Sequence, residues 1–204
     1  MPDHLSTLPL VAILRGVTPA RIEAVADRLF EAGIRAIEVP LNSPKPFESI
    51  AILAKLYGER CLTGAGTVAT PADVDRVADA GGRLVVSPHT DTRVIARTLE
   101  RGLAPMPGIL TPSEAYAAIG AGARTLKLFP AASMGIVHMK AIQVILPADV
   151  KLYAVGGVHA GNMAEWKKAG AAGFGLGGDL FKPDFSDDEI ARRARDTVAA
   201  FQTG

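Results

Sequence analysis

Three charged residues interrupt apolar runs that otherwise have the length and composition of buried strands. Glu38 lies in the run AIEVPL, Lys127 lies in TLKLF, and Arg15 follows VAIL. Because side chains alternate between the two faces of a strand, Glu38 and Lys127 point away from the apolar neighbours on their own strands. We therefore expect all three charges near the C-terminal ends of strands, facing one central cavity.

A lysine between leucines and a phenylalanine is in a setting that disfavours its charged form. With its amine partly neutral and near the cation of Arg15, Lys127 could attack a ketone and form a Schiff base, while Glu38 moves protons. The alternative is a structural ion-pair network. Burying three charges costs several kcal/mol per ion before pairing recovers part of it, so fold stability alone explains these residues poorly.

Two glycine clusters follow the last two apolar runs. The first is Val155-Gly156-Gly157-Val158, and the second is Gly175-Leu176-Gly177-Gly178-Asp179. Glycines after strands and before helices expose backbone N–H groups that can surround a phosphate. Tight turns would explain either cluster alone, but two clusters in adjacent units favour a phosphate site. The segment Gly64-Ala65-Gly66-Thr67 could bring a further hydroxyl to the substrate, although on its own it is a weak signal.

The histidines and the cysteine offer no metal-binding pattern. His4, His89, His138 and His159 show neither ligand spacing on a helix nor grouping with Cys61 or aspartate, so neither a metal nor another cofactor is predicted. We interpret the histidines as surface or loop residues and keep His89, which follows the fourth apolar run, as a weak candidate for the cavity. Cys61 is interpreted as a small buried apolar residue.

Eight short apolar runs must position these residues. They are Leu10–Leu14, Ala36–Leu41, Cys61–Ala65, Leu84–Ser87, Leu103–Met106, Thr125–Phe129, Lys151–Val155 and Gly173–Leu176. The 204 residues divide into about 25 per unit, enough for one strand, one short helix and two loops.

Helix-like segments with charged faces alternate with these runs. The expected helices include Pro19–Ala32, Pro44–Tyr57, Pro71–Ala80, Asp91–Arg101, Pro112–Gly120, Met134–Leu146 and Ser186–Phe201. A hydroxyl residue before proline marks four of their starts, at Thr18, Ser43, Thr70 and Thr111. Glycine is expected at several helix ends, as at Gly33.

This alternation predicts an α/β fold, a single (β/α)₈ barrel domain over residues 1–204. Strands that are apolar on both faces indicate a parallel sheet covered by helices. Eight such units close into a barrel whose functional residues gather at the C-terminal ends of the strands. A doubly wound open sheet is the competing architecture, disfavoured because all connections are short.

Composition excludes several classes of protein. With 22 Lys+Arg against 21 Asp+Glu, the chain has no electrostatic reason to bind nucleic acid or an acidic membrane surface. Gly, Pro or a charge interrupts every apolar stretch before it reaches the length of a bilayer span. Residues Met1 to Leu8 lack the pattern of a secretion signal, and one cysteine fits a reducing compartment. We expect a soluble cytoplasmic protein.

Eight ordered motifs spread over nearly the whole chain resemble those of the class I 2-keto-3-deoxy-6-phosphogluconate/galactonate aldolases. They are VAILRG at 11–16, AIEVPLNSP at 36–44, GAGTV at 64–68, SP at 87–88, MPGILTPSEA at 106–115, LKLFPA at 126–131, AVGGV at 154–158 and GLGGDL at 175–180. The resemblance implies a homotrimeric barrel without metal or cofactor. It also implies a phosphorylated 2-keto-3-deoxy sugar acid as substrate and pyruvate as one product.

Position by position, the resemblance assigns roles to residues already singled out. Lys127 matches the Schiff-base lysine, and Glu38 matches the proton donor and acceptor. The other matched positions bind substrate, and they are Arg15, Thr67, Val155, Gly156, Gly157, Gly177 and Gly178, with the glycines in the phosphate loops.

Two features favour the galactonate-type members of that family, which differ from the gluconate type in the configuration at C4 of the substrate. Leu41-Asn42 follows the glutamate, and Val155 stands where gluconate-type members have threonine. Valine cannot hydrogen-bond a substrate hydroxyl, so this exchange can change which epimer is held. Gly178 departs from the galactonate-type serine, which puts one phosphate hydrogen bond in doubt.

Three other functions stay open at this point. They are a gluconate-type or broad-specificity pyruvate aldolase, a noncatalytic phosphosugar-binding barrel, and a metal-dependent aldolase, the last disfavoured because no ligand cluster is present.

Overall fold

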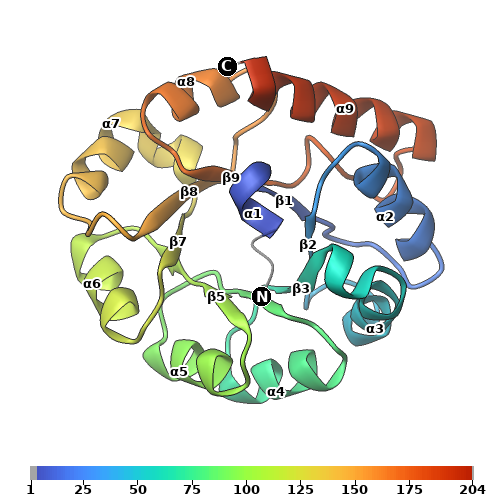
Figure 1. Cartoon of the computed structure of the whole chain (residues 1–204), viewed down its shortest axis with the longest axis horizontal. Coiled ribbons are helices and arrows are strands. Elements are labelled where there is room, and N and C mark those ends of the chain that lie inside the picture. The colour runs from blue at the N-terminus through green and yellow to red at the C-terminus, as the bar shows by residue number, and fades with distance from the viewer. Residues whose placement is uncertain (1–3, 204) are drawn as a thin grey trace.

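A computed structural model describes residues 4–203. These residues form a barrel of parallel strands surrounded by helices (Figure 1). The strands are β1 (Leu10–Ile13), β2 (Ala36–Pro40), β3 (Leu62–Gly66), β4 (Leu84–Val86), β5 (Ala104–Met106), β6 (Gly108–Ile109), β7 (Thr125–Leu128), β8 (Lys151–Val155) and β9 (Gly173–Leu176). The helices are α1 (His4–Thr7), α2 (Ile22–Glu31), α3 (Pro46–Tyr57), α4 (Pro71–Asp79), α5 (Thr92–Glu100), α6 (Pro112–Gly120), α7 (Ala131–Gln143), α8 (Met163–Lys168) and α9 (Asp187–Thr203), with a 3₁₀ turn at Gly58–Arg60.

The strand order, β5-β4-β3-β2-β1-β9-β8-β7-β6, closes the ring through one split strand. β5 pairs with β4, β6 pairs with β7, and only Pro107 separates β5 from β6. On one side of this break, the Ser87 amide donates to the Met106 carbonyl at 3.2 Å. On the other side, the Lys127 amide donates to the Pro107 carbonyl at 2.9 Å. The predicted barrel is therefore confirmed and the open doubly wound sheet is excluded. The short strand β6 was not predicted.

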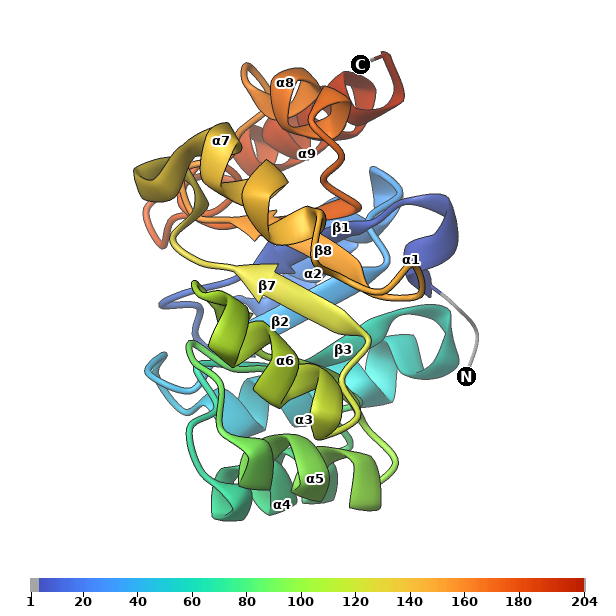
Figure 2. The same ribbon diagram turned by 90° about the vertical axis from the view of Figure 1, so that its left-hand side faces the viewer.

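Two apolar layers hold the barrel together. Inside the ring, side chains such as Val11, Leu62, Leu84 and Tyr153 form a small cluster that Leu5 of α1 also contacts. Between the ring and the helices lies the main core, which contains the outward-facing neighbours of the strand charges. Helix α1 lies at the N-terminal end of the strands, opposite the arrowheads (Figure 2). The other end of the barrel is thus left for the site.

The helix starts were predicted correctly at two positions and wrongly at two. The Thr70 and Thr111 hydroxyls accept from the amides of Asp73 and Glu114, as N-caps do. Helix α2 instead begins at Ile22, well after Thr18, and α3 begins at Pro46.

The Ser43 hydroxyl caps no helix because it accepts from the Gly16 amide at 2.9 Å, which ties the loop after β1 to the loop after β2. Helix α7 starts at Ala131, earlier than predicted, and has a non-helical residue at Gly135. Gly33 has the expected positive φ of 103° at its helix end.

The predicted limits 1–204 of the domain stay a prediction, since residues 1–3 and 204 lie outside the described part. The first three residues of the Met1–Leu8 segment also lie outside the described part. In residues 4–203, no helix is long and apolar enough to cross a membrane.

Candidate active site

Glu38 and Lys127 enter the barrel from strands on different sides of the ring. Glu38 on β2 is in register with Gly64 of β3, and Lys127 on β7 is in register with Tyr153 of β8. Strands β1, β9 and β8 lie between β2 and β7 in the ring. The predicted inward direction is confirmed, because the flanking Ile37, Val39, Leu126 and Leu128 all belong to the outer core.

The Glu38 carboxyl group is buried and only partly satisfied. The residue is 2% exposed, and its Oε2 has no hydrogen-bond partner. The lack of a side chain at Gly66 makes room for it, since a Cβ at that position would overlap the carboxylate. Burial raises the Glu38 pKa from 4.5 to about 7, against the attraction of Lys127 and Arg15. A carboxyl group with that pKa can both give and take a proton near neutral pH.

Lys127 has the surroundings of a nucleophilic amine. The residue is 7% exposed, and its Nζ lies 4.6 Å from the centroid of the Phe129 ring. Burial lowers the Lys127 pKa, the charge of Glu38 opposes this change, and the cation of Arg15 adds to it. An amine with a lowered pKa is more often neutral and so more able to attack a carbonyl carbon.

Arg15 and Thr67 lie in the loops after β1 and β3, the two strands that flank β2. The Arg15 Nη1 donates to Asn42 Oδ1 at 2.6 Å, so a residue of the loop after β2 orients the guanidinium. Thr67 follows β3 with a φ of 59°, in the left-handed region that costs a β-branched residue about 1–3 kcal/mol. Such strain is often found where a side chain is held for function rather than for stability.

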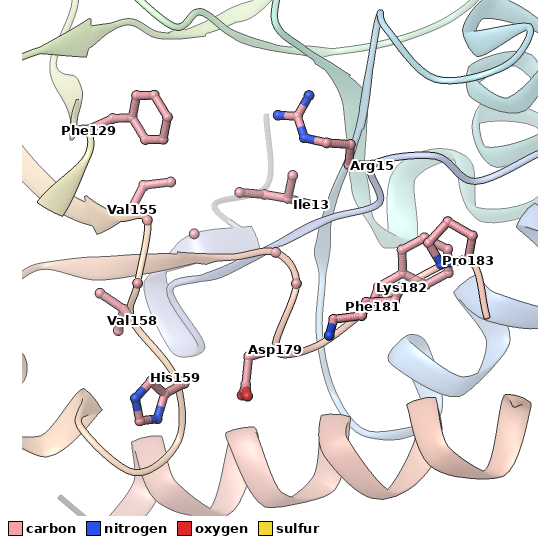
Figure 3. A pocket seen from close by; sticks show the side chains of 15 residues that line it. Ile13, Arg15, Phe129, Val155, Val158, His159, Asp179, Phe181, Lys182 and Pro183 are labelled. Carbon is pink, nitrogen blue, oxygen red and sulfur yellow. The ribbon is translucent and has the colours of Figure 1, made fainter. Parts of the chain in front are cut away.

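A cavity of about 570 Å³ lies between the two glycine loops (Figure 3). It brings together most of the predicted substrate-binding residues, which are Arg15, Val155, Gly156, Gly157, Gly177 and Gly178. Phe129 also lines it, so the ring next to the Lys127 amine forms part of its wall. Glu38, Lys127 and Thr67 are not among its lining residues. The contact between the cavity and the buried pair is therefore at Phe129, whose ring lies beside the Lys127 amine.

The loop after β8 has the backbone that its glycines allow. Gly156 and Gly157 have φ of 94° and 77°, and a Cβ on Gly157 would overlap Ala132. The Gly156 carbonyl accepts from the Ala132 amide at 2.9 Å. The Gly157 carbonyl accepts from Asn162 Nδ2 at 3.0 Å. These contacts hold the loop at the edge of the cavity in one conformation.

Sequence reasoning assigned no role to three lining residues with polar side chains, which are His159, Asp179 and Lys182. His159 and Lys182 both line the cavity, although His159 was interpreted as a surface or loop residue. Each follows a glycine cluster by a few positions, and that proximity is the signal that could have identified them. His89, the weak histidine candidate, is exposed in the loop after β4 and does not line the cavity. Among residues 4–203, no three His, Cys, Asp or Glu side chains converge as metal ligands would.

Comparisons with known proteins relate this chain to aldolases. The family model described as "KDPG and KHG aldolase" matches residues 1–193. A probable 2-dehydro-3-deoxy-6-phosphogalactonate aldolase of Rhizobium meliloti is 48% identical, over 95% of this chain and 91% of its own length. The 2-dehydro-3-deoxy-6-phosphogalactonate aldolase of Escherichia coli is 43% identical, over 96% and 95%.

Solved structures agree with these relatives. One described as native KDPGal superimposes with a TM-score of 0.95 and 42% identity, and the match covers 97% of this chain and 96% of that one. A KDPG aldolase of Legionella pneumophila, captured with pyruvate as a covalent carbinolamine intermediate, has a TM-score of 0.86 and 26% identity, with 96% of each chain covered.

Proposed function

The chain belongs to the KDPG and KHG aldolase family, and from this premise we propose that it cleaves 2-dehydro-3-deoxy-6-phosphogalactonate to pyruvate and D-glyceraldehyde 3-phosphate. The protein is a carbon–carbon lyase. The observation that carries the mechanism is the pair of buried, oppositely charged side chains, Glu38 and Lys127, on facing sides of one barrel.

The reaction starts at the Lys127 amine, which attacks the C2 carbonyl of the substrate to form a carbinolamine. Loss of water, assisted by protons from Glu38, leaves an iminium ion. The protonated nitrogen then accepts the electron pair of the C3–C4 bond when a proton leaves the C4 hydroxyl towards Glu38, and the aldehyde departs. The resulting enamine is then protonated at C3. Hydrolysis of the imine adds back one water, releases pyruvate and restores the free Lys127 amine. The Legionella relative with its covalent carbinolamine supports the first step.

The phosphate of the substrate occupies the cavity between the glycine loops. Gly156, Gly157, Gly177 and Gly178 lie at one end of that cavity, and Arg15 lines it as well. A phosphate held by the loops leaves the keto-acid end of the substrate free to reach towards Lys127, past the Phe129 ring. Arg15 and Thr67 bind the substrate at this end.

Borohydride reduction in the presence of pyruvate tests the lysine assignment. The expected result is one reduced pyruvyl adduct on the peptide that contains Lys127, detected by mass analysis. The Lys127→Arg variant should give none, and Lys140→Arg, on the exposed surface of α7, should give the wild-type yield. An adduct on another lysine, or no adduct in the wild type, would show that the mechanism is wrong.

The choice of C4 epimer rests on Val155, which lines the cavity and presents only carbon to the substrate. We expect the galactonate epimer to be cleaved with the higher kcat/KM. Val155→Thr should move the ratio of kcat/KM towards the gluconate epimer, while Val150→Thr, which lies just before β8 and does not line the cavity, serves as a control. Faster cleavage of the gluconate epimer by the wild type would make the protein a gluconate-type enzyme instead.

We also propose a homotrimer, as the family resemblance implies. Six large apolar side chains are exposed among the described residues, and four of them lie on α6, on α7 or directly after α7. These four are Tyr116, Met134, Val137 and Val144. The Tyr116 hydroxyl donates to the Ile145 carbonyl at 2.8 Å, which ties the two elements together. We name this surface the α6–α7 face and assign it to contact with a second copy of the chain.

A further inference from the structure

Lys182 lies at the edge of the cavity formed by the two glycine loops. It comes from the segment between β9 and α9, is exposed, and lines the cavity opposite Val155 and Phe129 (Figure 3). Its Cε is 4.0 Å from the position that a Cβ on Gly178 would take. The stem of the lysine thus runs beside the glycine that stands where a serine was expected.

A tight turn fixes the backbone on which Lys182 is carried. The Gly177 carbonyl accepts from the amides of Leu180 and Phe181, at 2.8 and 2.9 Å. The Phe181 side chain is 3% exposed and belongs to the main core, so it anchors the turn. On the other side, the Phe185 amide donates to the Lys182 carbonyl at 3.1 Å. The lysine therefore stands on an ordered support beside the cavity.

The charges around the cavity leave the Lys182 ammonium without a carboxylate partner within residues 4–203. Asp179, an acidic residue of the lining, already interacts with Arg193, whose Nη1 lies 3.4 Å from its Oδ1 and 2.8 Å from its carbonyl oxygen. The Lys182 Nζ lies 5.4 Å from the centroid of the Phe185 ring, an uncharged neighbour. Most arginines on the helices are paired with acids, as Arg97 is with Asp75 at 2.7 Å.

We propose that Lys182 is the cation that neutralises the phosphate group of the substrate and so selects phosphorylated over unphosphorylated keto acids. This inference rests on the proposed function. Backbone N–H groups supply hydrogen bonds to a phosphate but no full positive charge, and Gly178 supplies no hydroxyl. The other cation of the lining, Arg15, donates to Asn42 Oδ1 and is assigned to the keto-acid end of the substrate. A flexible ammonium beside Gly178 supplies the charge, as a point charge that can follow the phosphate during binding and release.

Kinetics on two substrates test this role. Lys182→Gln should lower kcat/KM for the phosphorylated substrate about tenfold, mainly through KM, because a charge-assisted contact is lost. The same variant should leave kcat/KM for the unphosphorylated analogue unchanged, and Lys182→Arg should keep most of the wild-type value. Lys55→Gln removes an exposed lysine on α3 and should behave as wild type. Equal losses on both substrates would overturn the proposal, because they would indicate a structural role.

Direct binding of inorganic phosphate separates this proposal from the aldolase mechanism. Isothermal titration calorimetry measures the dissociation constant for phosphate. Relative to the wild type at low salt, this constant should rise several-fold in Lys182→Gln, and it should also rise in the wild type at high salt. The borohydride adduct with pyruvate should form equally in both proteins. Equal phosphate affinities would refute the role of Lys182 even if the adduct forms. A missing wild-type adduct would refute the Lys127 mechanism while the phosphate result still stands.

Discussion

The burial of Glu38 should make one contribution to the stability of this protein fall as pH rises, and Glu38→Gln should remove that contribution. The pKa of Glu38 is 4.5 in an unfolded chain and about 7 in the fold, where burial is the main cause. At about 1.4 kcal/mol per pKa unit, ionising Glu38 in the folded protein costs roughly 3 kcal/mol more than ionising it in the unfolded chain.

The sign follows from proton binding. Because the folded state holds the Glu38 proton more tightly, the stability from this group is fully present below pH 4.5 and is lost as pH rises towards about 7. Glutamine carries no titrating group, so the variant does not lose stability from this position as pH rises. The free energy of unfolding of Glu38→Gln, relative to the wild type, should therefore rise by roughly 2–3 kcal/mol between about pH 5 and about pH 8.5.

Urea unfolding at several pH values, at one fixed protein concentration, measures this difference. Burying the glutamine amide has a cost that does not depend on pH, so it shifts the free energy of unfolding of Glu38→Gln equally at every pH. The change of that free energy with pH is therefore the quantity that tests the prediction. Glu59→Gln, which changes an exposed glutamate, should run parallel to the wild type. If Glu38→Gln also runs parallel to the wild type, Glu38 titrates normally and the reasoning from burial is refuted.

Three further changes have expected outcomes. Gly66→Ala places a Cβ against the Glu38 carboxylate and should lower kcat about 100-fold in steady-state kinetics, whereas Gly120→Ala, with open space around it, should not. Thr111→Ala removes the capping box of α6 and should lower the free energy of unfolding by about 1 kcal/mol, with unchanged KM. Val137→Lys places a charge on the α6–α7 face and should reduce the solution mass measured by light scattering; an unchanged trimer would assign assembly to another surface.

Local sequence patterns predicted the parts of the site that strand geometry alone decides. The inward direction of Glu38 and Lys127 follows from the alternation of side chains along a strand, which needs no knowledge of the neighbours. The barrel class followed in the same way from the repeated strand and helix signals. The glycine loop after β8 was also predicted, and its glycines fit because few other residues tolerate a positive φ such as that of Gly157.

Contacts between distant segments decided what those patterns left out. Ser43 has the sequence signature of an N-cap, yet its hydroxyl accepts from Gly16 of another loop. The closure of the ring depends on Pro107, whose two neighbouring segments pair with different strands. Neither outcome is visible within a window of a few residues.

The sequence by itself determined which residues we propose for the chemistry, and the tertiary structure decided the environment of each of them and which other residues lie beside them. The pKa of Glu38 depends on burial by the surrounding strands and on the charges of Lys127 from β7 and Arg15 from the loop after β1. The missing side chain of Gly66 leaves the room for the carboxyl group. Lys182 becomes a candidate only when the turn after β9 places it beside Gly178. Electrostatics and access depend on distances through space, and folding sets those distances between residues that are far apart along the chain.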